Sequence, residues 1–144
     1  MGGTIVCDVT DPRSGRGTAE FAGALGARLG LRLVLVYVVA GERPPAQAWA
    51  AHVLEQIARG LGHDAETRVA VGDHVETLAR VAAEEGADLV VVGARPAGLG
   101  GRNLRWTLAR ELEAATPVPV LVAPPSTRKR SDRRLAAAAD ADSR

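Results

Sequence analysis

Continuous apolar runs alternate along the chain with segments in which apolar residues recur every four positions. The run at 33–39 is rich in β-branched residues and the run at 89–92 has the same character, so both are typical of strands buried on both faces. A shorter run at 4–7 predicts another strand, and residues 67–71 alternate more, which favours a place nearer a sheet edge. Residues 118–122 are apolar but contain Pro119, which restricts this strand to an edge or to a special pairing.

The segments between these runs have helical periodicity and recognisable ends. Their apolar stripes are formed by Phe21, Leu25 and Leu29, by Trp49, Val53, Ile57 and Leu61, and by Leu104, Leu108 and Leu112. Gly30 is a predicted C-cap, and a further helix begins after Asp73 as N-cap and closes at Gly86. This alternation predicts a five-stranded, mainly parallel α/β sheet with helices on both faces, a Rossmann-like arrangement with right-handed crossovers.

Composition limits the classes of function. A chain of 144 residues with 47% apolar and 24% charged residues fits one globular domain. Aromatic residues make up only 3%, which argues against a nucleic-acid surface built on base stacking. Cys7 is the single cysteine, which excludes an intrachain disulfide, and His52 and His63 have no partner at metal-ligand spacing. No apolar run could span a bilayer and no signal-peptide start is visible, so we expect a cytoplasmic protein without nucleic-acid, membrane or metal partners.

The last part of the chain differs in composition from the rest. Residues 126–144 hold six Arg or Lys and three Asp, whereas residues 1–125 hold 12 Arg or Lys and 14 Asp or Glu. We therefore expect one ordered domain over residues 1–125 and a disordered, basic and alanine-rich tail over residues 126–144.

Two loops have the position and composition of a ligand site. In an open α/β sheet, ligands bind beyond the carboxyl ends of the strands, and residues 9–15 and 93–103 each follow a predicted strand. The second loop contains four glycines and leads into a helix, so its backbone amides, with Arg95 or Arg102, could hold a phosphate or another anion. The alternative is a surface loop whose glycines only permit the turn. A P-loop is excluded because no lysine follows any of these glycines.

Three segments resemble the universal stress protein family. They are residues 72–78, Gly-Asp-His-Val-Glu-Thr-Leu, residues 87–95, Ala-Asp-Leu-Val-Val-Val-Gly-Ala-Arg, and residues 117–122, Pro-Val-Pro-Val-Leu-Val. The likeness covers residues 3–125 and implies the adenine-nucleotide alpha-hydrolase-like fold, with ATP bound in some members. It also implies a homodimer formed partly by the final strand. Bare apolar edges pair with other chains, so we expect Val118, Val120 and Val122 at this interface, the alternative being an edge covered by the tail.

The glycine loop departs from the pattern of the nucleotide-binding members. That pattern is a glycine, two residues, a glycine, nine residues, then a glycine followed by serine or threonine. Gly93 matches the first glycine and Thr107 the hydroxyl residue, whereas Pro96 and Trp106 replace the other two glycines. Pro96 has no amide hydrogen to offer a phosphate, and Trp106 is expected to fill the vacated cleft or, alternatively, to anchor a partner. The glycines that could rebuild a cradle in shifted register are Gly98, Gly100 and Gly101.

The adenosine side of the site departs from the family as well. Members of the family usually carry an aspartate at the end of the first strand, where its carboxylate can reach the adenosine. The matching position is Thr10, with Asp8 and Asp11 on either side. A shift of one residue would let Asp11 serve, whereas Asp8 would have to turn out of the strand. Val38 matches the family's backbone contact to adenine.

These departures indicate that the chain is closer to the family members that lack the glycine signature. The preferred hypothesis is a non-catalytic regulatory or interaction protein with an unidentified protein partner and no cofactor. The first alternative is an ATP-binding switch, with Mg²⁺ when ATP is bound. The second is an enzyme that holds a phosphorylated substrate on the 93–103 loop. Asp73 and His74 are interpreted as a helix start rather than a catalytic dyad, so no catalytic residue is expected.

Overall fold

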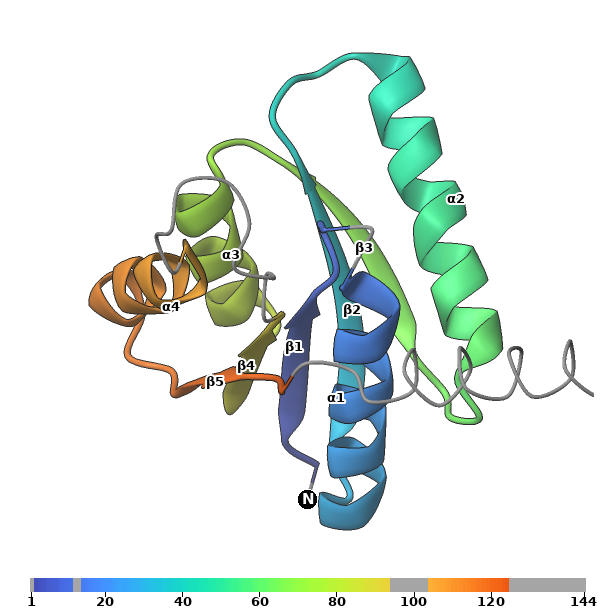
Figure 1. The fold of residues 1–144 in the computed structure, drawn as a ribbon, viewed down its shortest axis with the longest axis vertical. Coiled ribbons are helices and arrows are strands. Elements are labelled where there is room, and N and C mark those ends of the chain that lie inside the picture. The colour runs from blue at the N-terminus through green and yellow to red at the C-terminus, as the bar shows by residue number, and fades with distance from the viewer. Residues whose placement is uncertain (1, 12–13, 94–103, 125–144) are drawn as a thin grey trace, which may run out of the picture.

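Strands and helices alternate along the part of the chain that the structure describes (Figure 1). The structure is a computed structural model that describes residues 2–11, 14–93 and 104–124, and for residues 104–107 it describes the backbone alone. In chain order the elements are β1 (Thr4–Asp8), α1 (Gly15–Leu29), β2 (Arg32–Val39), α2 (Pro44–Gly60), β3 (Glu66–Val71), α3 (His74–Glu84), β4 (Leu89–Val92), α4 (Leu104–Ala115) and β5 (Val120–Val122).

The five strands form one sheet in the order β3-β2-β1-β4-β5, and every pair of neighbours is parallel. This confirms the predicted five-stranded parallel sheet, with residues 66–71 and the final strand at its two edges. The strand order reverses between β1 and β4, where Cys7 of β1 pairs with Val91 of β4. In sheets of this kind, ligands bind beyond the carboxyl ends of the strands at such a reversal.

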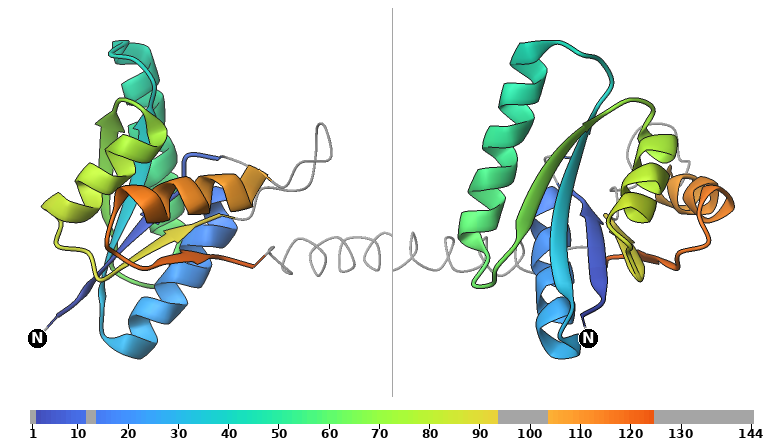
Figure 2. Two further views of the ribbon diagram at one scale, coloured as in Figure 1. Left: turned by 90° about the vertical axis from the view of Figure 1, so that its left-hand side faces the viewer. Right: turned by 180° about the vertical axis from the view of Figure 1, so that it is seen from behind.

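Two helical layers cover the sheet, with α1 and α2 on one face and α3 and α4 on the other (Figure 2). Successive residues of a strand point to opposite faces. Ile5, Cys7 and Val9 accordingly belong to the apolar cluster under α1 and α2, whereas Val6 belongs to the cluster under α3 and α4. By the same alternation, Asp8 at the end of β1 lies on the α3 side.

The apolar stripes expected for the first two helices are wrong in part. Leu29 and Trp49 are 61% and 60% exposed. The residues that α1 buries are small: Thr18, Ala19, Ala22, Gly23 and Gly26, with Gly15 at its start. A Cβ on Gly26 would lie 3.1 Å from the Leu31 carbonyl oxygen, so the end of α1 lies too close to the turn before β2 for a side chain at this position. In α2 the buried residues are Ala50, Leu54 and Ile57, which rotates Trp49 out to solvent.

The third helix is held at both ends. Asp73 caps its start, because its carboxylate accepts a hydrogen bond from the Glu76 amide at 3.2 Å, as predicted. At its other end, the Glu85 carboxylate bonds Arg32 of β2 at 2.9 Å and Arg68 of β3 at 3.0 Å. The contacts of Glu85 hold the end of α3 against β2 and β3, and its start follows directly from the carboxyl end of β3.

Among the residues that the structure describes, no helix combines the length and apolar character that a membrane crossing requires.

Candidate functional site

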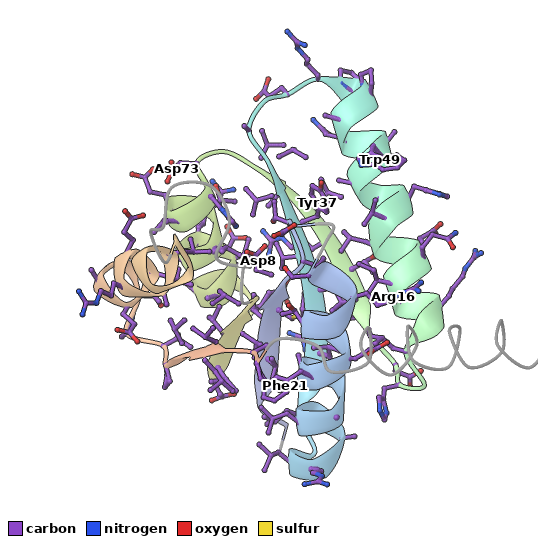
Figure 3. The ribbon with its side chains drawn as sticks, viewed as in Figure 1. Asp8, Arg16, Phe21, Tyr37, Trp49 and Asp73 are labelled. Carbon is purple, nitrogen blue, oxygen red and sulfur yellow. The ribbon has the colours of Figure 1, made fainter. Side chains whose placement is uncertain are left out.

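A buried carboxylate lies at the carboxyl end of β1. Asp8 is 7% exposed and is placed near the centre of the molecule, between the start of α3 and the start of α1 (Figure 3). Its Oδ1 accepts two hydrogen bonds from Thr10, one from the backbone amide at 3.1 Å and one from the hydroxyl at 2.5 Å. Aspartate often bonds the backbone two residues later in this way, and the bond turns the chain out of the strand.

The Thr10 hydroxyl also reaches the second strand. Its Oγ1 accepts a hydrogen bond from the Val38 amide at 3.0 Å. The two segments are already adjacent, because the Val9 amide donates to the Val36 carbonyl at 2.9 Å, one step beyond the end of β1. Thr10 and Val38, both proposed from the sequence, are therefore brought together. They are bonded to each other, and the Val38 amide is in use within the protein itself.

The first residue of α3 completes this group of polar contacts. His74 Nε2 lies 2.8 Å from Asp8 Oδ2, within hydrogen-bonding distance. The alternation of β1 directs Asp8 to the α3 side of the sheet, and the Asp73 cap sets His74 in the first turn of the helix. We call Asp8, Thr10, His74 and the Val38 amide the Asp8 cluster.

A small pocket lies beside this cluster, at the reversal between β1 and β4. Among the described residues, those that line it are Asp8, Asp11, Ser14, Gly93 and Leu108. Ser14 stands before the first turn of α1. A Cβ on Gly93 would lie 2.7 Å from Thr18 Oγ1 and 2.8 Å from Ser14 Oγ, so only glycine lets the end of β4 approach α1 this closely.

The structure thus places four of the residues proposed from the sequence in this region. Thr10 and Val38 belong to the Asp8 cluster, and Asp11 and Gly93 line the pocket. Thr107 and Trp106 lie in α4, with side chains outside the description. The remaining loop residues lie outside the described residues: Arg95, Pro96, Gly98, Gly100, Gly101 and Arg102.

Sequence reasoning missed Asp8 and His74 as site residues. Asp8 ends β1 in regular pairing with Val36 and lines the pocket without turning out of the strand. The sequence did contain a signal for Asp8. It is a polar residue in β1, and the alternation of side chains along this strand places it on the α3 face of the sheet. The start of α3 also lies beyond the carboxyl edge of the sheet, which is where that side chain points.

The cysteine in the same strand has a different environment. Cys7 is fully buried, and this burial, followed by the neighbouring Asp8 charge, raises the pKa of its thiol well above the ordinary value. The thiol stays protonated, as expected of a small buried hydrophobe. Within the described ranges, no group of three or more His, Cys, Asp or Glu could hold a metal ion.

The sequence as a whole matches a known family. The model of the universal stress protein family matches residues 1–124. The chain belongs to the universal stress protein family. The resemblance seen in the sequence is confirmed, and the match covers all the described strands and helices.

Solved structures of universal stress proteins have the same fold. One from Archaeoglobus fulgidus has a TM-score of 0.72 at 20% identity, over 86% of this chain and 100% of that one. A universal stress protein in complex with cAMP has a TM-score of 0.67 at 21% identity, over 86% and 98%. A universal stress protein from A. fulgidus in complex with dAMP has a TM-score of 0.64 at 19% identity, over 85% of this chain and 98% of that one. At these identities the likeness shows the fold alone. No curated protein is significantly similar in sequence.

Proposed function

We propose that this universal stress protein is a non-catalytic regulatory or interaction protein of the cytoplasm that works without a bound adenine nucleotide. One observation carries the proposal: the Val38 amide donates to Thr10 Oγ1 at 3.0 Å. In the family pattern, the backbone at this position contacts adenine. We call the position of the Val38 amide the base subsite. In this chain the Thr10 hydroxyl occupies the base subsite.

Opening the base subsite would cost more than one hydrogen bond. A base that takes the Val38 amide displaces Thr10 Oγ1, whose proton is donated to Asp8 at 2.5 Å. Each intramolecular hydrogen bond is worth about 0.5–1.5 kcal/mol, and a buried carboxylate that loses a donor adds a desolvation penalty. The ligand would have to replace both contacts before any affinity is gained.

The sequence of the glycine loop supports the same conclusion from the phosphate side. Pro96 stands where the family pattern has a glycine, and proline has no amide hydrogen to donate to a phosphate oxygen. Trp106 stands at the third glycine position, so a large side chain replaces a residue that has none in the nucleotide-binding pattern. At these two positions the sequence therefore offers one backbone donor fewer than the nucleotide-binding pattern.

Calorimetric titration of the full chain tests this proposal. We expect no binding of ATP with Mg²⁺, or of AMP, at concentrations up to about 1 mM, which corresponds to about −4 kcal/mol. Thr10→Ala removes the hydroxyl from the Val38 amide, and we expect it to gain AMP affinity. Thr67→Ala, at an exposed position of the edge strand β3, is the matched control and should gain none. Micromolar binding of ATP by the unmodified protein would overturn the proposal.

A nucleotide-dependent switch is the second candidate. It is favoured by Gly93, which matches the first glycine of the family pattern and lines a pocket at the strand-order reversal. Solved universal stress proteins hold cAMP and dAMP, which makes adenosine monophosphates the ligands to try first. Because a ligand that binds only the native state raises its stability, a rise in melting temperature with cAMP or AMP would favour this candidate over the first.

The same proposal includes a homodimer formed through the final strand. β5 is an edge strand, and its residues Val120, Leu121 and Val122 are each partly exposed, as is Val118 before it. An apolar edge with unpaired backbone groups is suited to pairing with a second copy across a two-fold axis.

A further inference from the structure

His74 and Asp8 join two elements that lie 66 residues apart in the sequence. The imidazole Nε2 of His74 lies 2.8 Å from Asp8 Oδ2, and the two side chains are 26% and 6% exposed. The contact thus connects the start of α3 to the end of the central strand β1. Sequence reasoning assigned no role to this histidine beyond its place in a helix start.

Asp8 is the centre of the cluster because both of its carboxylate oxygens are engaged. Oδ2 faces the imidazole, while Oδ1 accepts from the amide and the hydroxyl of Thr10. A buried carboxylate must be hydrogen-bonded to offset its lost hydration, so its orientation is set by the donors on its two sides. Removing the donor on one side therefore changes the geometry on the other.

The Thr10 hydroxyl transmits this orientation to β2. A hydroxyl has one proton to donate, and here it is donated to Asp8. The lone pairs of Oγ1 are thereby directed away from Asp8, and one of them accepts from the Val38 amide. The Asp8 cluster is one continuous series of hydrogen bonds, from the imidazole on α3 to the amide on β2.

We propose that His74 is the positioning residue that keeps the base subsite closed, so that affinity for adenosine-containing nucleotides is controlled from the start of α3. The inference rests on the proposed function, in which Thr10 holds the Val38 amide. Without the imidazole, Asp8 Oδ2 loses its hydrogen-bond donor. Because Asp8 lines the pocket, a ligand there could supply a new donor. The ribose hydroxyls and the exocyclic amine of adenosine are donors of the required kind.

Amide hydrogen exchange measured by NMR on the full chain tests the positioning role without any nucleotide. In His74→Ala, we expect the Val38 amide to exchange about tenfold faster, as the loss of one hydrogen bond implies. The Val91 amide in the centre of the sheet should keep its protection. His74→Gln, whose Nε2 can take the place of the imidazole Nε2, should restore the slow exchange of Val38. His52→Ala, at an exposed position on α2, is the matched control and should leave Val38 unchanged.

Calorimetric titration of the same variants with AMP tests the control of affinity. We expect His74→Ala to bind AMP at least about tenfold more tightly than the unmodified protein and His74→Gln. His74→Asn, whose amide is too short to reach the Nε2 position, is the second variant and should behave like His74→Ala. It keeps the test available if His74→Ala does not fold.

The outcomes separate this inference from the function on which it rests. Unchanged Val38 protection in His74→Ala and His74→Asn overturns the inference and leaves the Thr10 contact intact. Faster exchange at both Val38 and Val91 also overturns it, because the effect is then a loss of global stability. Faster exchange at Val38 alone without a gain in AMP affinity overturns the control of affinity. Tight AMP binding by the unmodified protein overturns the proposed function itself.

Discussion

The guanidinium of Arg32 and the carboxylate of Glu85 lie 2.9 Å apart, which joins the first residue of β2 to the C-cap residue of α3. Arg32 also donates to Glu66 on β3, and its Nε donates to Thr4 Oγ1 on β1 at 3.3 Å. Glu85 in turn bonds Arg68. Three strands and one helix are thereby connected at the amino end of the sheet, opposite the candidate site.

The central position of Glu85 in these ion pairs predicts a measurable effect on stability. Glu85→Ala should lower the free energy of unfolding by about 1 kcal/mol, because it removes the shared partner of two arginines at a half-buried position. Glu66→Ala removes one exposed pair and should cost less than about 0.5 kcal/mol. Urea denaturation of both variants measures the difference, which should shrink in high salt because salt screens exposed charges. Equal effects of the two substitutions would contradict the prediction.

The acid side of the stability profile should depend on Glu84. The hydrogen bond from Arg68 lowers the pKa of this carboxyl from its ordinary value of 4.5, with smaller contributions from the charges of Arg68 and Arg80. A carboxyl whose pKa is lower in the folded state contributes stability above its unfolded-state pKa. That contribution is lost as the pH falls through the lowered folded-state value.

The corresponding measurement is the melting temperature between about pH 6 and pH 3, the range in which glutamates are protonated. Glu84→Gln should flatten the fall in melting temperature below about pH 4.5. Profiles that superimpose for the protein and Glu84→Gln would show that this carboxyl has the same pKa in both states.

Gly93 is expected to tolerate no side chain. Gly93→Ala would place its Cβ 2.7 Å from Thr18 Oγ1, which is itself bonded to the Ser14 carbonyl at 2.8 Å. We expect a loss of about 1–3 kcal/mol in the free energy of unfolding, as for other overpacked positions. Gly62→Ala, where a Cβ meets nothing within 4 Å, is the control and should change stability by less than about 1 kcal/mol. A neutral Gly93→Ala would mean that the end of β4 can move away from α1.

The proposed homodimer makes a prediction about the final strand. Val120→Asp should shift sedimentation from dimer to monomer, because it places a charge on the edge that the two copies would share. The circular dichroism spectrum should remain that of a folded protein, since Val120 is only partly buried. Thr67→Asp on the opposite edge strand is the control and should leave the dimer intact. An unchanged sedimentation profile of Val120→Asp would reject the pairing.

The sequence was sufficient for the architecture because each strand carries its own signal. The runs at 33–39 and 89–92 are apolar on both faces, and only a sheet covered by two helical layers buries both faces of such strands. Asp73 and Gly30 likewise act locally, as cap residues do, and both predictions are confirmed. Signals that act within a few residues can be interpreted from one chain.

The site was predicted less well because it depends on contacts between distant segments. The pairing of His74 with Asp8 requires the alternation of one strand, the order of the sheet and the start of one helix to be known together. Trp49 was assigned to a buried stripe for a similar reason, since a spacing of four residues does not determine which side of a helix faces the sheet. Ala50, one residue later, faces it instead.

The place of β1 in the sheet has a consequence for synthesis of the protein. The first strand is flanked by β2 and β4, and the Thr4 amide bonds the Asp88 carboxylate 84 residues later. Such distant pairings form slowly, because closing a long loop costs chain entropy before any contact compensates for that cost. On the ribosome, the amino-terminal strand can complete its hydrogen bonds only after β4 has emerged. One edge of its backbone therefore stays open to chaperones, or to other nascent chains, for most of translation.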